Sequence, residues 1–210
     1  MRYLNKIVFI NSAAIRYSEV QLDGNIHLIG TQGVGKSTIL RAILFFYNAD
    51  TQRLGIPVEK KSYQDYYFPY ADSSIIYEVA REDGWFTVLS YKTMNRICYR
   101  FIASPYRPDL FIDEEGAPYP SDRIRSVLDK NGIKYSGAIS TYEEYRNILY
   151  GNSDNKRDYS CYSLMESGSY QNIIRTIQNV LLNSRLEADY IKQTIITSLN
   201  EADSVIDLSR

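Results

Sequence analysis

Residues 30–38 have the types and the spacing of a loop that binds phosphate groups. They read GTQGVGKST and match the pattern G-x-x-x-x-G-K-[ST]. Glycines let successive backbone N–H groups turn toward phosphate oxygens, which a Cβ atom would obstruct. In this pattern Lys36 contacts the β- and γ-phosphates, and the hydroxyl of Ser37 coordinates Mg²⁺. The sequence therefore predicts that ATP and Mg²⁺ are bound by Gly30, Gln32, Gly33, Val34, Gly35, Lys36, Ser37 and Thr38.

Such a loop has to lie between a strand and a helix. Residues 25–29 are mostly apolar, have the length of a strand and follow the turn-forming pair Asp23 and Gly24. After the loop, apolar residues at helical spacing predict a helix from Ser37 to about residue 48. Thr38 begins this helix, whose N-terminal N–H groups and dipole favour an anion. Strand, loop and helix thus occur in the order that phosphate binding requires.

The whole chain is expected to form one α/β lobe with three parts. Residues 1–50 are the phosphate-loop core, 51–135 an antiparallel β-subdomain and 136–210 a helical part. Apolar runs and alternation predict further strands at residues 6–10, 15–22, 74–80, 85–91, 96–103 and 110–113. Helical spacing predicts helices at residues 120–131, 141–149 and from 170 to the end. Thr141 and Glu144 form a capping-box pattern at the start of the second of these helices.

Composition and charge limit the classes of protein. With 210 residues, of which 44% are hydrophobic, the chain can form a sizeable core. The net charge of −1 argues against an autonomous nucleic-acid-binding module, although it leaves room for a local basic face. The sequence has no secretion signal and no apolar run long enough to span a membrane, so we expect a cytoplasmic protein with no membrane partner. The 20 tyrosines are expected to be half-buried on sheets or to lie at an interface.

The single histidine and the two cysteines offer little chemistry. His27 lies in the predicted strand before the loop, where a structural role is commoner than a catalytic one. This argues against histidine-based triads and histidine-rich metal sites. Cys98 and Cys161 have no metal-ligand spacing, so we expect ordinary reduced thiols.

Hydrolysis of ATP by such a loop also needs an acidic residue on a buried strand to hold Mg²⁺. The sequence LFIDEE at residues 110–115 places three apolar residues before Asp113, but the run is short and a glycine turn closes it. We interpret it as a surface hairpin. No LSGG-type signature follows, and no later strand ends in acidic residues. The chain therefore has the features of one half of a split ATPase head, with the main catalytic residues outside it.

Three segments resemble one family. The strands and the loop that lead into the helix after residue 38 resemble the N-terminal lobe of an SMC-type ABC ATPase head, in which asparagine is commoner at the position of Gln32. The segments TYEEYRNILYG (141–151) and YSLMESGSYQNIIRTIQNVLL (162–182) are similar to the MukB and JetC (Wadjet, Mks) branch. The resemblance implies an ABC-ATPase-like α/β lobe with a mixed sheet, an antiparallel β-subdomain and C-terminal helices that lead toward a coiled coil.

The resemblance also implies partners and further site residues. ATP would lie between two heads, each completed by a C-terminal lobe of the same protein, and the full complex would act on DNA with kleisin-like accessory subunits. A glutamine that senses Mg²⁺ and water is assigned to Gln171, with Gln64 as the alternative. Arg53 lies where such heads often carry an arginine that faces nucleotide or DNA, and a plain surface role is the alternative.

Three functions are compatible with these features. The first is an SMC-like head that entraps or moves DNA, in chromosome organisation or in defence against plasmids. The second is a self-contained phosphate-loop kinase or NTPase in which Asp113 or Glu114 holds Mg²⁺. The third is a nucleotide-binding interaction module that never hydrolyses its ligand. A kinase would need a lid with arginines and an acceptor pocket, whereas the middle of this chain predicts strands.

Overall fold

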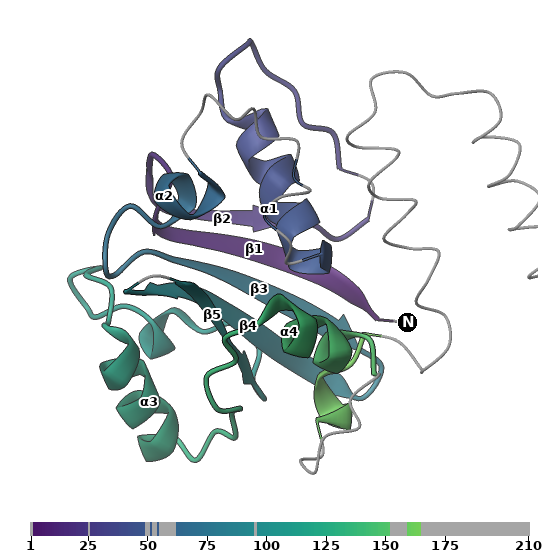
Figure 1. Cartoon of the computed structure of the whole chain (residues 1–210), viewed down its shortest axis with the longest axis vertical. Helices are drawn as coiled ribbons and strands as arrows, with labels where there is room; N and C mark the ends of the chain where they lie inside the picture. The colour runs from purple at the N-terminus through teal and green to yellow at the C-terminus, as the bar shows by residue number, and fades with distance from the viewer. Residues whose placement is uncertain are drawn as a thin grey trace, which may run out of the picture.

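The computed structural model describes residues 2–24, 26–48, 51, 54, 62–94, 96–151 and 159–164. These residues form one five-stranded sheet with helices on both faces (Figure 1). The strands are β1 (Tyr3–Ser12), β2 (Ile15–Gln21), β3 (Ser74–Arg81), β4 (Gly84–Thr93) and β5 (Arg96–Ile102). The helices are α1 (Lys36–Asn48), α2 (Tyr63–Tyr67), α3 (Ser121–Lys130) and α4 (Tyr142–Leu149), with 3-10 turns η2 (Pro108–Leu110) and η3 (Ser160–Tyr162).

The sheet is antiparallel throughout the described residues, in the order β2-β1-β3-β4-β5. β1 lies between β2 and β3, and Phe9 is opposite both Ser18 and Ile75. This pairing joins strands of residues 1–50 and 51–135 in a single sheet. The all-antiparallel arrangement differs from the mixed sheet that the resemblance implied, because the predicted strand next to the phosphate loop is not paired into it.

The two faces of the sheet carry separate apolar clusters. α1 contributes Phe45 and Phe46 to the larger cluster, which also contains residues of α2 and α4. α3 contributes Ile124 and Leu128 to the second cluster, which also contains Phe111 from the turn after η2. Successive side chains of β1 enter the two clusters in turn, as expected for a strand covered on both sides. α1 and α3 therefore lie on opposite faces of the sheet (Figure 1).

Most of the predicted elements are confirmed. The structure contains the strands predicted at 6–10, 15–22, 74–80, 85–91 and 96–103, and the helices predicted at 37–48, 120–131 and 141–149, with small shifts of their ends. The capping prediction is also confirmed, since the Thr141 side chain accepts a hydrogen bond from the backbone N–H of Glu144 at 3.2 Å. The helix predicted from residue 170 onward lies outside the described residues.

Two predicted strands are wrong, and one helix was not foreseen. Residues 26–29 form no strand, because no neighbouring strand pairs with them in the described part of the chain. Residues 110–113 begin within η2 and continue into a turn that is closed by an isolated bridge between Ile112 and Pro118. α2 has no counterpart among the predicted elements, since its five residues are too few for a helical period to stand out.

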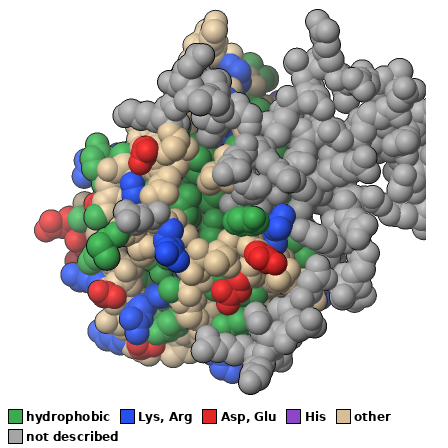
Figure 2. All heavy atoms as spheres, in the orientation of Figure 1, with side chains coloured by type: hydrophobic (Ala, Val, Ile, Leu, Met, Phe, Trp, Pro, Cys, Tyr) green, Lys and Arg blue, Asp and Glu red, His purple; other side chains and the backbone are tan. Residues whose placement is uncertain are grey.

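Charged side chains of both signs are interspersed on the face shown in Figure 2. Hydrophobic side chains reach the surface near its centre, and lysines and arginines lie among aspartates and glutamates around them. The described side chains in this view therefore form no patch of a single sign. No helix among the described residues combines the length and the apolar character needed to cross a membrane.

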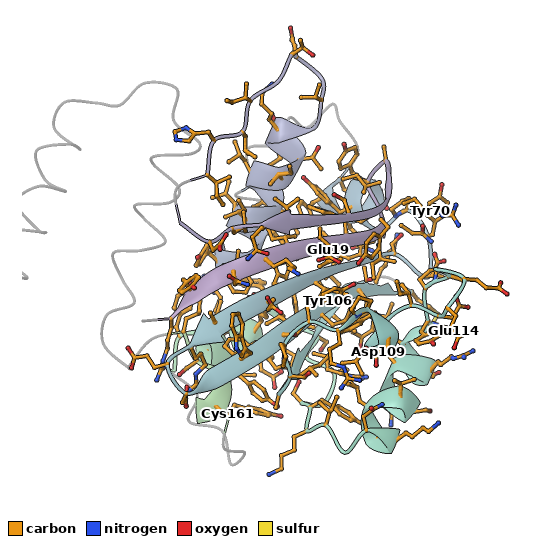
Figure 3. The ribbon with its side chains drawn as sticks, turned by 180° about the vertical axis from the view of Figure 1, so that it is seen from behind. Glu19, Tyr70, Tyr106, Asp109, Glu114 and Cys161 are labelled. Atoms are coloured by element: carbon orange, nitrogen blue, oxygen red, sulfur yellow. The ribbon has the colours of Figure 1, made fainter. Side chains whose placement is uncertain are left out.

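A small polar cluster lies on β1 and β2, on the side of the sheet seen in Figure 3. Lys6 forms an ion pair with Glu19 at 2.7 Å, and the hydroxyl of Tyr17 donates to Glu19 and contacts the hydroxyl of Tyr106 at 3.0 Å. Burial raises the pKa of Glu19, but the hydrogen bonds from Lys6 and Tyr17 lower it more, so the net shift is downward. The ionised carboxylate of Glu19 therefore stabilises the folded state.

Candidate functional site

The loop at residues 30–35 curves sharply around the end of one side chain. Gly33 and Gly35 have φ angles of 91° and 94°, which side chains with a Cβ atom rarely adopt. Lys36 reaches back across the loop, and its Nζ donates to the carbonyl oxygens of Gly30 at 2.5 Å and Thr31 at 2.7 Å. One ammonium group is therefore held at the centre of the loop by two backbone oxygens.

The start of α1 continues this arrangement. The N–H groups of Thr38 and Ile39 both donate to the Gly35 carbonyl oxygen, at 3.0 and 3.1 Å, which closes the first turn. The N–H groups that precede this first helical bond lack intrahelical partners and carry the positive end of the helix dipole. Ser37 is exposed beside them, and Lys36 is partly exposed. The arrangement can hold a phosphate group, and Ser37 can add an oxygen ligand to a phosphate-bound Mg²⁺.

The described residues supply no complete metal site. No group of three or more His, Cys, Asp or Glu side chains among them is placed to hold a metal ion. The ligands of the predicted Mg²⁺ would therefore include phosphate oxygens as well as the Ser37 hydroxyl, as the phosphate-loop pattern implies. The donors around the loop suit the phosphates better than they suit a metal alone.

Tyrosines from distant parts of the chain hold α1 in place. Four hydroxyls donate to backbone carbonyl oxygens along this helix: Tyr67 to Thr38 at 2.7 Å, Tyr77 to Ala42 at 3.0 Å, Tyr145 to Phe46 at 2.6 Å, and Tyr150 to Tyr47 at 2.6 Å. The first three acceptors are spaced by four residues, so they lie on one face of the helix. The sequence predicted half-buried tyrosines, but these four are fully buried. Burial is possible because each hydroxyl donates to a backbone carbonyl oxygen.

The last two of these bonds act on the C-terminal end of α1. The last four carbonyl oxygens of a helix have no intrahelical donor, and Phe46 and Tyr47 lie among them. Tyr145 of α4 and Tyr150, which follows α4, fill this role from about a hundred residues away. Burial raises the pKa of Tyr145, so its hydroxyl stays protonated and remains a donor. α4 and the residue that follows it therefore cap the helix after the candidate loop.

α2 contacts α1 near both of its ends. Its Tyr63 ring stacks between Phe45 and Tyr67, with ring centroids 4.4 and 4.1 Å apart. The adjacent Tyr66 is 39% exposed, and its hydroxyl lies 3.2 Å from Oγ1 of Thr38, the last residue of the loop pattern. Sequence reasoning missed Tyr66. The available signal was Ser62, whose side chain accepts from the N–H of a residue three positions later, a helix-start pattern.

Asp113 has a structural role in the turn after η2. Its Oδ1 accepts hydrogen bonds from the backbone N–H groups of Glu115 at 3.0 Å and Ala117 at 2.7 Å. The neighbouring Phe111 packs in the cluster on the α3 face, opposite to α1. Figure 3 shows Glu114 beside α3, away from the phosphate loop. The interpretation as a surface hairpin is confirmed in part: Glu114 is exposed in the turn, whereas Leu110 and Phe111 are buried. Neither acidic residue is near Ser37.

The segment that leads into the loop is exposed. Ile26 is 40% and Ile29 is 90% exposed, which is high for apolar side chains of a predicted strand. His27 is exposed as well. Position 25 lies outside the described residues, so this description starts at Ile26.

Several predicted residues fall outside the site or outside the description. Gln171 and Arg53 both lie outside the described residues. Gln64 lies in α2 and is partly buried. Cys98 is buried and Cys161 is exposed, and neither forms a disulfide.

The chain was compared with known proteins. A family model described as a protein of unknown function (DUF3584) matches residues 12–210. The chain belongs to the DUF3584 family. The DUF3584 match begins at the last residue of β1 and includes the loop, α1 and every later element, so the whole candidate site lies within the family region. No curated protein matches the chain.

Proposed function

We propose that the chain is the N-terminal part of an SMC-like ATPase head that binds ATP and Mg²⁺ at residues 30–38. Completed by a C-terminal lobe and paired with a second head, it drives the entrapment or translocation of DNA. The observation that carries the proposal is the curved loop with the Lys36 ammonium inside it, at the start of an anchored helix. On binding, the β- and γ-phosphates take the place of the two carbonyl oxygens as partners of this ammonium.

Two observations support a head that another lobe completes. Asp113 is committed to a turn on the far side of the sheet from α1, which favours an acidic Mg²⁺ ligand supplied by another lobe. Ile26 and Ile29 are exposed in a segment with the length and composition of a strand. Strands of a C-terminal lobe would pair with this segment and bury both side chains.

Within SMC-like heads we place the chain in the MukB and JetC branch, on the resemblance of residues 141–151 and 162–182. The first of these segments contains Tyr145 and Tyr150, which cap α1, so it also belongs to the framework of the loop. The branch would use kleisin-like subunits and act in chromosome organisation or in defence against plasmids. This setting is cytoplasmic.

Calorimetric titration of MgATP into the chain tests the nucleotide site. Lys36→Ala is expected to weaken binding by about 2 kcal/mol or more, or about thirtyfold, because a charge on the phosphates is lost. Lys130→Ala is the matched control, since this lysine ends α3 on the opposite face of the sheet. Unchanged ATP affinity in the Lys36→Ala variant would show that the loop does not have the assigned role.

A second experiment tests the split head. ATP turnover is expected to appear only when a C-terminal head fragment from the same protein is added to the chain. Brisk turnover by the chain alone would instead favour the self-contained kinase or NTPase. ATP binding without turnover under either condition would favour the interaction module.

A further inference from the structure

Tyr66 occupies a position at the candidate nucleotide site that the loop pattern does not describe. It belongs to α2, whereas every residue of the pattern comes from residues 30–38. Its hydroxyl lies 3.2 Å from Oγ1 of Thr38, which is the residue after the predicted Mg²⁺ ligand Ser37. Thr38 is 9% exposed and Tyr66 is 39% exposed, so the threonine is buried while the tyrosine is accessible to solvent.

The surroundings of Tyr66 hold it in this position. The next residue, Tyr67, donates its hydroxyl to the Thr38 carbonyl oxygen at 2.7 Å, and the two tyrosine rings meet edge to face with centroids 5.0 Å apart. Asp65, on the other side, forms an ion pair at 3.3 Å with Lys92 of β4. The helix that carries Tyr66 is therefore tied both to the start of α1 and to the sheet.

The two hydroxyls leave one hydrogen-bond donor available. Either oxygen can donate in the bond between Tyr66 and Thr38, and that bond uses one of their two protons. The described residues show no acceptor for the second proton. A charged phosphate oxygen is a strong acceptor for such a donor, because hydrogen bonds to ionised groups are about twice as strong as neutral ones.

We propose that Tyr66, acting with Thr38, contacts the α-phosphate of the bound nucleoside triphosphate. This inference rests on the proposed function. Lys36 takes the β- and γ-phosphates and Ser37 takes Mg²⁺, whereas the pattern gives the α-phosphate backbone N–H groups but no side-chain partner, which the next residue along the helix and its hydroxyl partner can supply. Tyr66 then binds the end of the triphosphate that is joined to the nucleoside, and it does so from outside the loop.

Calorimetry with two ligands, MgATP and magnesium tripolyphosphate, tests this contact. Tyr66→Phe removes only the hydroxyl and is expected to weaken both ligands about tenfold, since both present a phosphate at this position. Tyr66→Ala is expected to weaken them to a similar extent. Tyr70→Phe is the matched control, because Tyr70 is 62% exposed and lies at the edge of the molecule beyond α2 (Figure 3). It is expected to leave both affinities unchanged.

Other results would overturn the proposal in different ways. If Tyr66→Phe keeps both affinities while Tyr66→Ala weakens ATP alone, the ring stacks on the base and the hydroxyl contact is wrong. If Tyr66→Phe lowers the melting temperature but not the affinities, the hydroxyl only braces α2 against α1. In both cases a loss of binding in Lys36→Ala leaves the proposed function standing. If the unaltered chain binds neither ligand, the proposed function and this inference fail together.

Discussion

Removing the hydroxyl of Tyr145 tests how α4 anchors the helix that follows the loop at residues 30–35. In the native structure this hydroxyl donates at 2.6 Å to the Phe46 carbonyl oxygen, which lies in the last turn of α1. Tyr145 is 1% exposed, so water cannot replace the lost donor without a rearrangement. Tyr145→Phe therefore leaves a buried carbonyl oxygen with no partner from its own helix.

The expected magnitude follows from a comparison with Tyr77. The hydroxyl of Tyr77 donates to the Ala42 carbonyl oxygen, which lies in the middle of α1 and already accepts a bond within the helix. Tyr77→Phe is therefore expected to lower the free energy of unfolding by about 0.5–1.5 kcal/mol, the net contribution of an ordinary hydrogen bond. Tyr145→Phe leaves the buried Phe46 carbonyl oxygen without a donor and is expected to lower the free energy of unfolding by about 1–3 kcal/mol.

Urea denaturation and thermal melting of the chain measure both effects. A loss of about 2 kcal/mol in a chain of this length lowers the melting temperature by about 4–8 °C. Tyr142→Phe is the control, because Tyr142 belongs to the same helix but is 50% exposed, and its substitution is expected to change the stability by less than about 0.5 kcal/mol. If Tyr145→Phe is no more destabilising than Tyr77→Phe, the capping of α1 by α4 does not contribute as reasoned here.

Three further perturbations follow from local contacts. Asp113→Asn is expected to leave ATP affinity, and turnover in an assembled head, nearly intact, because Asp113 only closes a turn. A loss of turnover of about a hundredfold would contradict this expectation. Thr141→Ala is expected to lower the free energy of unfolding by about 1 kcal/mol, because the hydrogen bond that caps α4 is lost. Thr141→Ser should keep this hydrogen bond and the stability. Equal stability of the unaltered chain and both variants would contradict the role of the cap. Because the pKa of Glu19 is lowered in the folded state, its stabilising effect is present at neutral pH and is lost as the pH falls through that lowered pKa. Stability measured between neutral and acidic pH should therefore fall less in a Glu19→Gln variant, and an identical pH dependence in both proteins would contradict this role.

Much of the fold could be predicted because the signals were local. The hairpin of β3 and β4 follows from two apolar runs around a glycine turn, and α4 follows from helical spacing after Thr141. The strand at residues 25–29 was predicted on equal grounds, and its described part, residues 26–29, forms no strand. A strand needs a paired neighbour, and composition does not say whether one is present. The same limit applies to α2, whose single turn is formed against α1 and would be too short to persist alone.

The sequence by itself determined the glycine-rich pattern of residues 30–38 and the helix that follows them, because both depend on residue types within a few positions of each other. Only the tertiary structure decided what surrounds them. The pairing of β1 with β3, the capping of α1 by Tyr145 and the place of Tyr66 beside Thr38 join residues that are far apart in the chain. Such contacts form where buried polar groups find partners across the packed core, and no local pattern records which tyrosine hydroxyl meets which carbonyl oxygen.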